Sequence, residues 1–425
     1  MSEMNSLTLN GKTYDCFVDG VARSSVVISS ASGESITVPD SSNQPFVGLN
    51  LYGRSTQSGT PTPDAPIDIV SSGADGSIGI DVYGKNLLQI NKSAAGVPLT
   101  NRGITFTRNA DDSITINGTA SGNAFYNIDY EGGDVKYPTK TKLVASLGGV
   151  VDGIVMVVGY FDSNGSTVDN VADVRTWKPS VEFELPASAK RGRSYLMVAD
   201  GTTLNNVVVY PMIRLAKFTG NTFEPHKTEQ HLVVETPKGL MASPVTDKNI
   251  ATYTDANGKM WRADEIDLER GVRIQRVKEF AFAVADMNNL DAYPGWKGLT
   301  ELLTCFPSGT NNPVITISNI GDDVCINTAN SNYVLYLPNE AYGMTQTQWK
   351  EKHPDMVCTF LFPLITPIET PLTDVEIAAY KALQTNKPST SVLNDSGAFM
   401  SMNYIADAKS YIDNKVSGIM AATVE

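Results

Sequence analysis

Two clusters of acidic residues are the first candidates for chemistry in this sequence. Two carboxylates that converge on one glycosidic bond can hydrolyse it, one of them acting as a general acid. The candidates are Asp111, Asp112 and Asp129 in the first cluster, and Asp264, Glu265 and Asp267 in the second. Asp111 and Asp112 fall in a predicted turn, where aspartate is common because its side chain bonds the nearby backbone. The second cluster alternates along a predicted strand, which would point its members to opposite faces of a sheet.

The short motifs of common catalytic and phosphate-binding sites do not occur in the sequence. There is no G-x-S-x-G, no H-E-x-x-H and no P-loop. We therefore predict that the protein is not an enzyme and uses no cofactor.

A glycan site is the second candidate chemistry. It would need an exposed aromatic ring beside amide or charged groups that can bond hydroxyls. The aromatic and polar residues that could contribute are Asn123, Phe125, Tyr126, Asn127, Tyr130, Tyr160, Arg175 and Trp177. We expect such a site to centre on Asn123, Tyr126 and Trp177. The alternative is that strand alternation sends about half of these rings into a core.

Metal ions, nucleic acid and membranes are poor candidates as partners. The three histidines, His226, His231 and His353, are too scattered for a zinc site, and acidic turns are too common to assign calcium. A net charge of -13 repels phosphates, which argues against nucleic acid. The most apolar stretch, residues 148–161, contains Asp152 and is too short to cross a bilayer.

Short alternating strands dominate the sequence, so the predicted fold class is mainly β. In "GITFTRNADDSITINGTASGNAFYNI", residues 103–128, isoleucine and phenylalanine alternate with threonine on both sides of a polar turn. Further strands of this kind predict a jelly-roll sandwich over residues 81–227, with a strand order that resembles carbohydrate-binding modules. The other predicted regions are an N-terminal β attachment region with a Pro-rich connector (1–80), a β connector (228–274), a mixed α/β or β-sandwich domain (275–400) and a C-terminal helix (401–425).

Several local signals refine these regions. Asn10 and Gly11 predict a hairpin, residues 25–38 predict a second one, and "DANGK" predicts a third. The three prolines of "PTPDAP", residues 61–66, predict an extended link between two β-units. Thr373 with Glu376 forms a capping-box pattern at the start of the clearest helix, and Thr345 with Gln348 forms another.

The C-terminal helix carries an apolar stripe of Ile405, Ile412, Val416 and Ile419. Such a stripe is typical of helices that pack against identical copies, so we expect a homo-oligomer, most simply a trimer. The alternative is that the stripe docks on the chain's own body.

Four segments together resemble tail and baseplate structural proteins of phages and prophages of Gram-positive bacteria. They are "FVGLNLYGRSTQSGTPTPDAPIDIVSSG", "GKNLL", "TYTDANGKMWRADEIDLERG" and "PLTDVEIAAYKALQTNKPSTSVLNDSGAFMSMNYIADAKSYIDNK". The resemblance covers most of the chain from about residue 47 and implies an oligomeric virion component near the tail tip. It brings no catalytic residues.

The expected function is therefore an oligomeric scaffold or adaptor of a phage tail tip, in contact with other tail or baseplate proteins. The alternative is a receptor-binding protein whose jelly roll binds host cell-wall polysaccharide. The N-terminus has no visible secretory signal, so we expect assembly in the bacterial cytoplasm and release by lysis.

Overall fold

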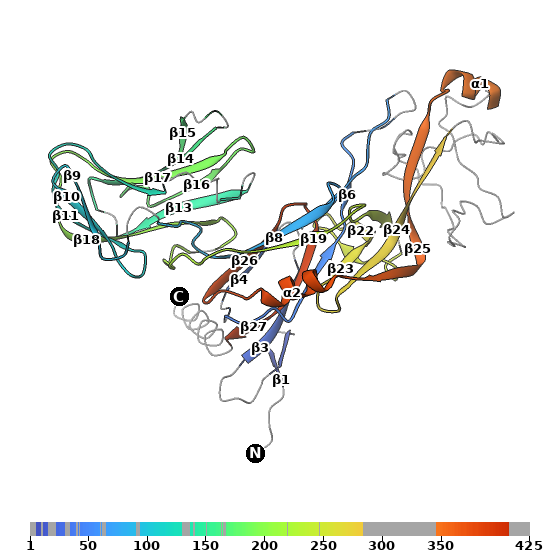
Figure 1. The fold of residues 1–425 in the computed structure, drawn as a ribbon, viewed down its shortest axis with the longest axis horizontal. Coiled ribbons are helices and arrows are strands. Elements are labelled where there is room, and N and C mark those ends of the chain that lie inside the picture. Colours follow the sequence, from blue (N-terminus) through green and yellow to red (C-terminus); the bar gives the residue numbers. More distant parts are fainter. Residues whose placement is uncertain are drawn as a thin grey trace, which may run out of the picture.

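The computed structural model describes residues 6–9, 12–15, 23–29, 35–39, 41, 43–59, 61, 65–90, 94–129, 137–138, 141–149, 151–162, 164, 167–218, 220–245, 247–283 and 346–407. These residues are mainly β, as predicted. They form two parts (Figure 1). One is the jelly roll, and the other, which we call the body, is built from strands that precede and follow the jelly roll in the chain.

The jelly roll contains two sheets. Its strands are β9 (Pro98–Asn101), β10 (Ile104–Arg108), β11 (Ile114–Thr119), β12 (Ala124–Asp129), β13 (Lys142–Gly148), β14 (Ile154–Phe161), β15 (Thr167–Val174), β16 (Ser180–Glu184), β17 (Arg191–Val198) and β18 (Thr203–Leu215). One sheet has the order β16-β13-β18-β11-β10-β9, and the other has the order β12-β17-β14-β15. From β11 to β18 every step but one crosses between the sheets, which is jelly-roll topology. The predicted sandwich is therefore confirmed.

The core of the jelly roll follows the alternation seen in residues 103–128. Ile104, Phe106, Ile114 and Ile116 are fully buried between the two sheets. The predicted start at residue 81 is wrong, because residues 81–84 complete β8 (Ser77–Gly84), which pairs with strands of the body. The jelly roll therefore begins after Gly84.

The body is a second sandwich. Its smaller sheet has the order β19-β8-β26-β4, and its larger one has the order β25-β24-β23-β5-β27-β3. The strands not yet given bounds are β3 (Arg23–Ser29), β4 (Ser35–Pro39), β5 (Gly48–Tyr52), β19 (Gln230–Glu235), β23 (Glu265–Asp267), β24 (Val272–Ala283), β25 (Val357–Pro371), β26 (Ser389–Asn394) and β27 (Phe399–Asp407). Both sheets contribute to one apolar core, with Ile80 and Val392 from the smaller sheet and Leu49, Leu51 and Met402 from the larger.

Two predictions about the separate regions are wrong. Residues 228–274 are no connector, because β19 pairs with β8 and β23 pairs with β5. Residues 25–38 form no hairpin, because β3 pairs with β27 and β4 pairs with β26. The reason is the same in each case: local alternation shows that a segment is a strand, but the shared core decides its partner.

The Pro-rich segment also has a different place from the one expected. The short strands on either side of it, β6 (Ser55–Thr56) and β7 (Val70–Ser71), pair with each other. Gln57 Nε2 donates a hydrogen bond to the carbonyl oxygen of Ile67 at 2.8 Å, which holds the two ends of this loop together. The two ends of the Pro-rich segment thus lie together on the body, so it does not link two β-units.

Two local hairpins are confirmed. β1 (Ser6–Leu9) pairs with β2 (Lys12–Asp15), with Leu9 opposite Lys12. β21 (Tyr253–Thr254) pairs with β22 (Met260–Ala263), and β22 also pairs with β20 (Ala242–Val245) in a small sheet. Within the "DANGK" turn, Asp255 Oδ1 accepts hydrogen bonds from the N–H groups of Asn257 and Lys259, as turn chemistry predicts.

The described residues contain two helices, α1 (Gln346–Lys352) and α2 (Asp374–Ala382). The capping box of α2 is confirmed, with Thr373 and Glu376 bonding each other's backbone N–H groups. The second expected capping box involves Thr345, which lies outside the described residues. For the predicted domain at 275–400, the described strands β24, β25 and β26 all belong to the body.

The expected C-terminal helix does not begin at residue 401. Ile405 lies in β27, opposite Ser25 of β3, so its assignment to a helical stripe is wrong. A strand neighbour on each side, β5 and β3, fixes this segment as sheet. Ile412, Val416 and Ile419 lie outside the described residues.

Glu376 should contribute more to stability than an ordinary capping residue. Besides the capping box, its Oε1 accepts hydrogen bonds from Arg273 Nη2 at 2.5 Å and from the N–H of Glu235 at 3.0 Å. Burial alone would raise the pKa of Glu376, but the hydrogen bonds from Thr373 and Glu235 and the charge of Arg273 outweigh it and lower the pKa.

We expect Thr373→Ala to lower the free energy of unfolding by about 1 kcal/mol, because it removes a cap. Glu376→Ala should lower it by about 3 kcal/mol, because it also removes the carboxylate partner of the partly buried Arg273. Chemical denaturation measures both. Val375→Ala, at an exposed position of the same helix, is the control and should change the free energy by less than about 0.5 kcal/mol. Equal losses for the two test variants would contradict the wider role of Glu376.

Candidate functional site

A buried polar joint connects the jelly roll to the body. Lys85 Nζ donates a hydrogen bond to the carbonyl oxygen of Thr222 at 2.9 Å and lies 3.7 Å from Glu224 Oε1. That same oxygen accepts a hydrogen bond from Ser389 Oγ of β26 at 3.0 Å. Burial raises the pKa of Glu224, and the bond from Ser389 and the charge of Lys85 oppose the shift. The "GKNLL" segment thus lies where the chain leaves the body for the jelly roll, and its Lys85 contacts Thr222 and Glu224, where the chain returns.

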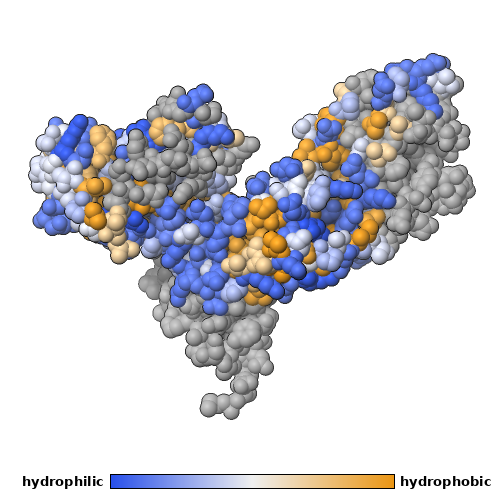
Figure 2. All heavy atoms as spheres, in the orientation of Figure 1, coloured by the Kyte–Doolittle hydropathy of each residue, from blue (hydrophilic) through white to orange (hydrophobic). Residues whose placement is uncertain are grey.

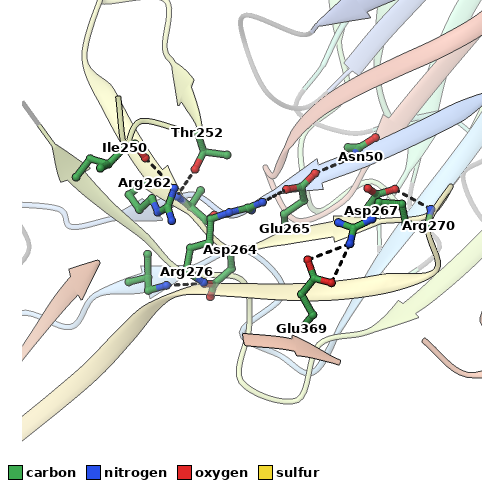
Figure 3. Close-up of polar contacts among 12 residues, drawn as sticks. Asn50, Ile250, Thr252, Arg262, Asp264, Glu265, Asp267, Arg270, Arg276 and Glu369 are labelled. Atoms are coloured by element: carbon green, nitrogen blue, oxygen red, sulfur yellow. Dashed lines mark hydrogen bonds and ion pairs between the residues drawn. The ribbon is translucent and has the colours of Figure 1, made fainter. Parts of the chain in front are cut away.

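Asp264, the most buried member of the second acidic cluster, binds the protein's own backbone (Figure 3). Its Oδ1 accepts hydrogen bonds from the N–H groups of Arg276 at 2.7 Å and Val277 at 2.9 Å, and Oδ2 accepts one from Met241 at 3.0 Å. The register of β24 against β25 shifts between Gln275 and Val277. A bulge of this kind frees backbone N–H groups from the ladder, and the carboxylate of Asp264 satisfies them.

The other acidic side chains of this cluster are also held by protein groups (Figure 3). Glu265 bonds Arg276 Nη2 at 2.6 Å through Oε2 and Asn50 Nδ2 at 2.6 Å through Oε1. Asp267 Oδ1 accepts a hydrogen bond from the N–H of Arg270 at 2.9 Å. This arrangement fixes β5, β23 and β24 against one another.

The first acidic cluster behaves as its turn position predicts. Asp111 Oδ1 accepts hydrogen bonds from the N–H and Oγ of Ser113, at 3.1 and 2.6 Å, and the bond from the Ser113 hydroxyl lowers the pKa of Asp111. Asp112 Oδ1 accepts hydrogen bonds from Arg108 at 2.6 and 2.8 Å. Asp129 lies at the end of β12, opposite Ser194.

The structure does not bring together the three residues expected to bind glycan. Tyr126 is only 2% exposed and stacks on Phe106 in the core, with ring centroids 5.3 Å apart, so it cannot be a platform. Asn123 is exposed, and its Oδ1 accepts a hydrogen bond from the N–H of Asp200 at 3.1 Å. Trp177 is 76% exposed in the turn after β15. Asn123 precedes β12 and Trp177 follows β15, so both lie at the same end of the four-stranded sheet. β12 and β15 are its two outer strands, three strand spacings apart, which separates the two residues by about 14 Å.

A different set of residues forms the exposed aromatic surface of the jelly roll. Phe125 is 41% exposed on the outer face of β12, and its ring lies 5.9 Å from that of Tyr195 on β17. The guanidinium of Arg193 lies 4.9 Å from the centre of the Tyr195 ring. The signal for this face was present in the sequence, because burial of Ala124, Tyr126 and Ile128 requires Phe125 to point outward.

Neither a metal centre nor a membrane span is found where the structure describes the chain. No cluster of three or more histidine, cysteine, aspartate or glutamate side chains there could hold a metal ion. No helix there is both long and apolar enough to cross a bilayer. On the face drawn in Figure 2, hydrophobic residues lie in separate groups among hydrophilic ones.

Comparisons with known proteins give no family. No model of a protein family matches the chain, and no curated protein matches it. A glycosylation-associated protein complex (Gap123) from Streptococcus agalactiae is similar over 33% of this chain and 48% of that one, at 10% identity and a TM-score of 0.22. The VP2 subviral particle of infectious bursal disease virus matches 95% of this chain and 82% of that one, at 8% identity and a TM-score of 0.13. Similarity this weak carries no functional argument.

The pH dependence of stability tests the role of Asp264. Burial raises the pKa of its carboxyl from 3.8 to about 6, and the three N–H donors oppose the shift. The folded state therefore holds the proton more tightly than the unfolded state. The resulting stabilisation is complete below about pH 4 and is lost as the pH rises through 6, roughly 3 kcal/mol in total.

Asp264→Asn removes this titration. The free energy of unfolding of the wild type relative to the variant should therefore fall by about 3 kcal/mol between about pH 4 and pH 7. Chemical denaturation of both proteins across this range measures the difference. A difference that stays constant with pH would show that the carboxyl does not titrate in this way.

Proposed function

We propose that this protein is a structural component of a phage tail tip or baseplate, in which the body acts as an oligomeric scaffold or adaptor and the jelly roll projects from it. One observation supports the proposal. The segments that resemble tail proteins lie far apart in the sequence, but they contribute strands to the same folded body. Residues 46–73 include β5 to β7, residues 252–271 include β21 to β23, and residues 371–415 include α2, β26 and β27. The "GKNLL" segment is the joint to the jelly roll.

The proposal includes no catalytic role. The buried carboxylates of the second acidic cluster bind backbone N–H groups, arginines and an asparagine of the protein itself. These contacts support a non-enzymatic protein whose function depends on its shape and contacts.

Electron microscopy of the phage particle that carries this chain tests the assignment. Gold-labelled antibodies raised against the jelly roll should bind at the tail tip. Label on the capsid, or on no part of intact particles, would contradict a tail component.

The oligomer should depend on the segment after β27. Truncation after Asp407 removes Ile412, Val416 and Ile419 and leaves β27 complete between β5 and β3. We expect the full chain to form a stable homo-oligomer, a trimer, and the truncated chain to shift toward monomer while keeping its cooperative unfolding transition. Light scattering and thermal unfolding measure the two properties.

A truncation that also removes residues 399–407 is the contrasting variant. It deletes a strand with neighbours on both sides and should abolish cooperative folding of the body. A full-length chain that is strictly monomeric would contradict the homo-oligomer.

The second candidate function is a receptor-binding protein that contacts host cell-wall polysaccharide through the jelly roll. The exposure of Trp177 and Phe125 favours it, because aromatic side chains dominate the energetics of binding interfaces. The two functions are compatible, since a scaffold at the tail tip can also present a binding domain.

A further inference from the structure

The outer face of the four-stranded jelly-roll sheet has aromatic and charged residues along both margins. Strand alternation turns Ala124, Tyr126, Leu196, Met156 and Val174 into the core. Their neighbours therefore point outward. The outward positions on the four strands are Phe125 and Asn127 on β12, Arg193, Tyr195 and Met197 on β17, Val155, Val157 and Gly159 on β14, and Asp173 on β15.

The first margin is aromatic. Phe125 and Tyr195 lie diagonally across β12 and β17, with ring centroids 5.9 Å apart, and Arg193 lies over the Tyr195 ring. Asn127 is directly opposite Tyr195 in the register. This margin therefore combines two flat apolar rings with an amide and a guanidinium.

The second margin lies along β15 and the turn that follows it. Arg175 bonds Asp173 Oδ2 through Nη2 at 2.5 Å and through Nε at 3.0 Å. Its guanidinium carbon lies 5.4 Å from the centre of the Trp177 ring. The ion pair and the ring stack hold the arginine in one place beside the exposed tryptophan.

Only small or β-branched residues lie between the margins. Val155 and Val157 of β14 are each 6% exposed, and Gly159 follows them on the same face. Tyr195, Val157 and Asp173 form one row across three strands, which puts the two margins about 10 Å apart. The outward side chains of β14 are thus almost completely covered, and the exposed rings and charged groups lie along the two margins.

We propose that this face binds a polysaccharide chain through the exposed rings and polar groups of its two margins. The proposal rests on the receptor-binding form of the proposed function and names its site. Flat rings such as Phe125, Tyr195 and Trp177 can cover the C–H faces of pyranose units, while Asn127 and Arg193 can bond their hydroxyls.

The composition of the face favours this occupant over a protein or a nucleic acid. Protein interfaces need a desolvated apolar centre, whereas the valines here are already covered and charged groups interrupt the rings. Nucleic acid needs a run of cations, whereas one of the two arginines here is paired with Asp173 and the whole chain carries a net charge of -13.

The test uses the full-length protein on an array of polysaccharides purified from Gram-positive cell walls. Binding to at least one of them is expected, and its Kd is then measured by titration. Tyr195→Ala and Trp177→Ala should each weaken binding about tenfold, because each removes a stacking ring. Thermal unfolding of the variants checks that the jelly roll remains folded. Trp177→Ala should not disturb folding, because this side chain is 76% exposed.

Tyr210→Ala is the matched control. Tyr210 lies on β18 of the other sheet, with its ring centroid 5.3 Å from that of Phe223, and should leave the affinity unchanged within about twofold. Absence of binding to every polysaccharide, or an equal loss in Tyr210→Ala, would overturn the site. Neither result would affect the proposed tail scaffold, which depends on the position of the chain in the particle and on its oligomeric state.

Discussion

The pairing of the early strands with the last described ones is the constraint on which the rest of the body depends. β8 lies between β19 and β26, and β5 lies between β23 and β27. Buried backbone groups must be hydrogen-bonded, so neither β5 nor β8 is complete until residues 389–407 have joined it. Side chains support the same closure, since Asp395 Oδ1 accepts a hydrogen bond from the N–H of Gly79 at 2.9 Å, and the hydroxyls of Ser41 and Thr390 lie 2.8 Å apart.

This closure also explains how the chain carries a jelly roll without disturbing the body. The jelly roll is inserted between β8 and β19, and these two strands are paired neighbours. The chain therefore leaves and re-enters the body at adjacent points, and the buried Lys85, Glu224 and Ser389 hold that place. Such an insertion can vary or gain a binding surface while the scaffold stays the same.

The sequence predicted features that depend on neighbouring residues. The 103–128 strands, the "DANGK" hairpin and the Thr373–Glu376 capping box each depend on the chemistry of a few adjacent positions, and the structure contains all three. Features that depend on distant partners were not predictable. β3 and β4 look like a hairpin by alternation, but β3 pairs with β27 and β4 pairs with β26, at least 350 residues away in the sequence.

The candidate site shows the same limit. Alternation could place Phe125 and Tyr126 on opposite faces, but choosing Tyr126 as the exposed one required knowing which face was the core. Asp264 looked like a possible acid, and only the bulge in β24 shows why a buried carboxylate is needed there. Ile405 fits a helical spacing in the sequence, but its segment is a strand because it pairs with β5 on one side and with β3 on the other.

Native-state hydrogen exchange with increasing denaturant, read by mass spectrometry, tests the closure of the body most directly. Peptides from β5, β8, β26 and β27 should lose protection in one cooperative step, and peptides from the jelly roll should lose theirs in a separate one. If β5 and β8 kept their protection after β26 and β27 had exchanged, the N-terminal strands would fold without the C-terminal ones. That result would contradict the account.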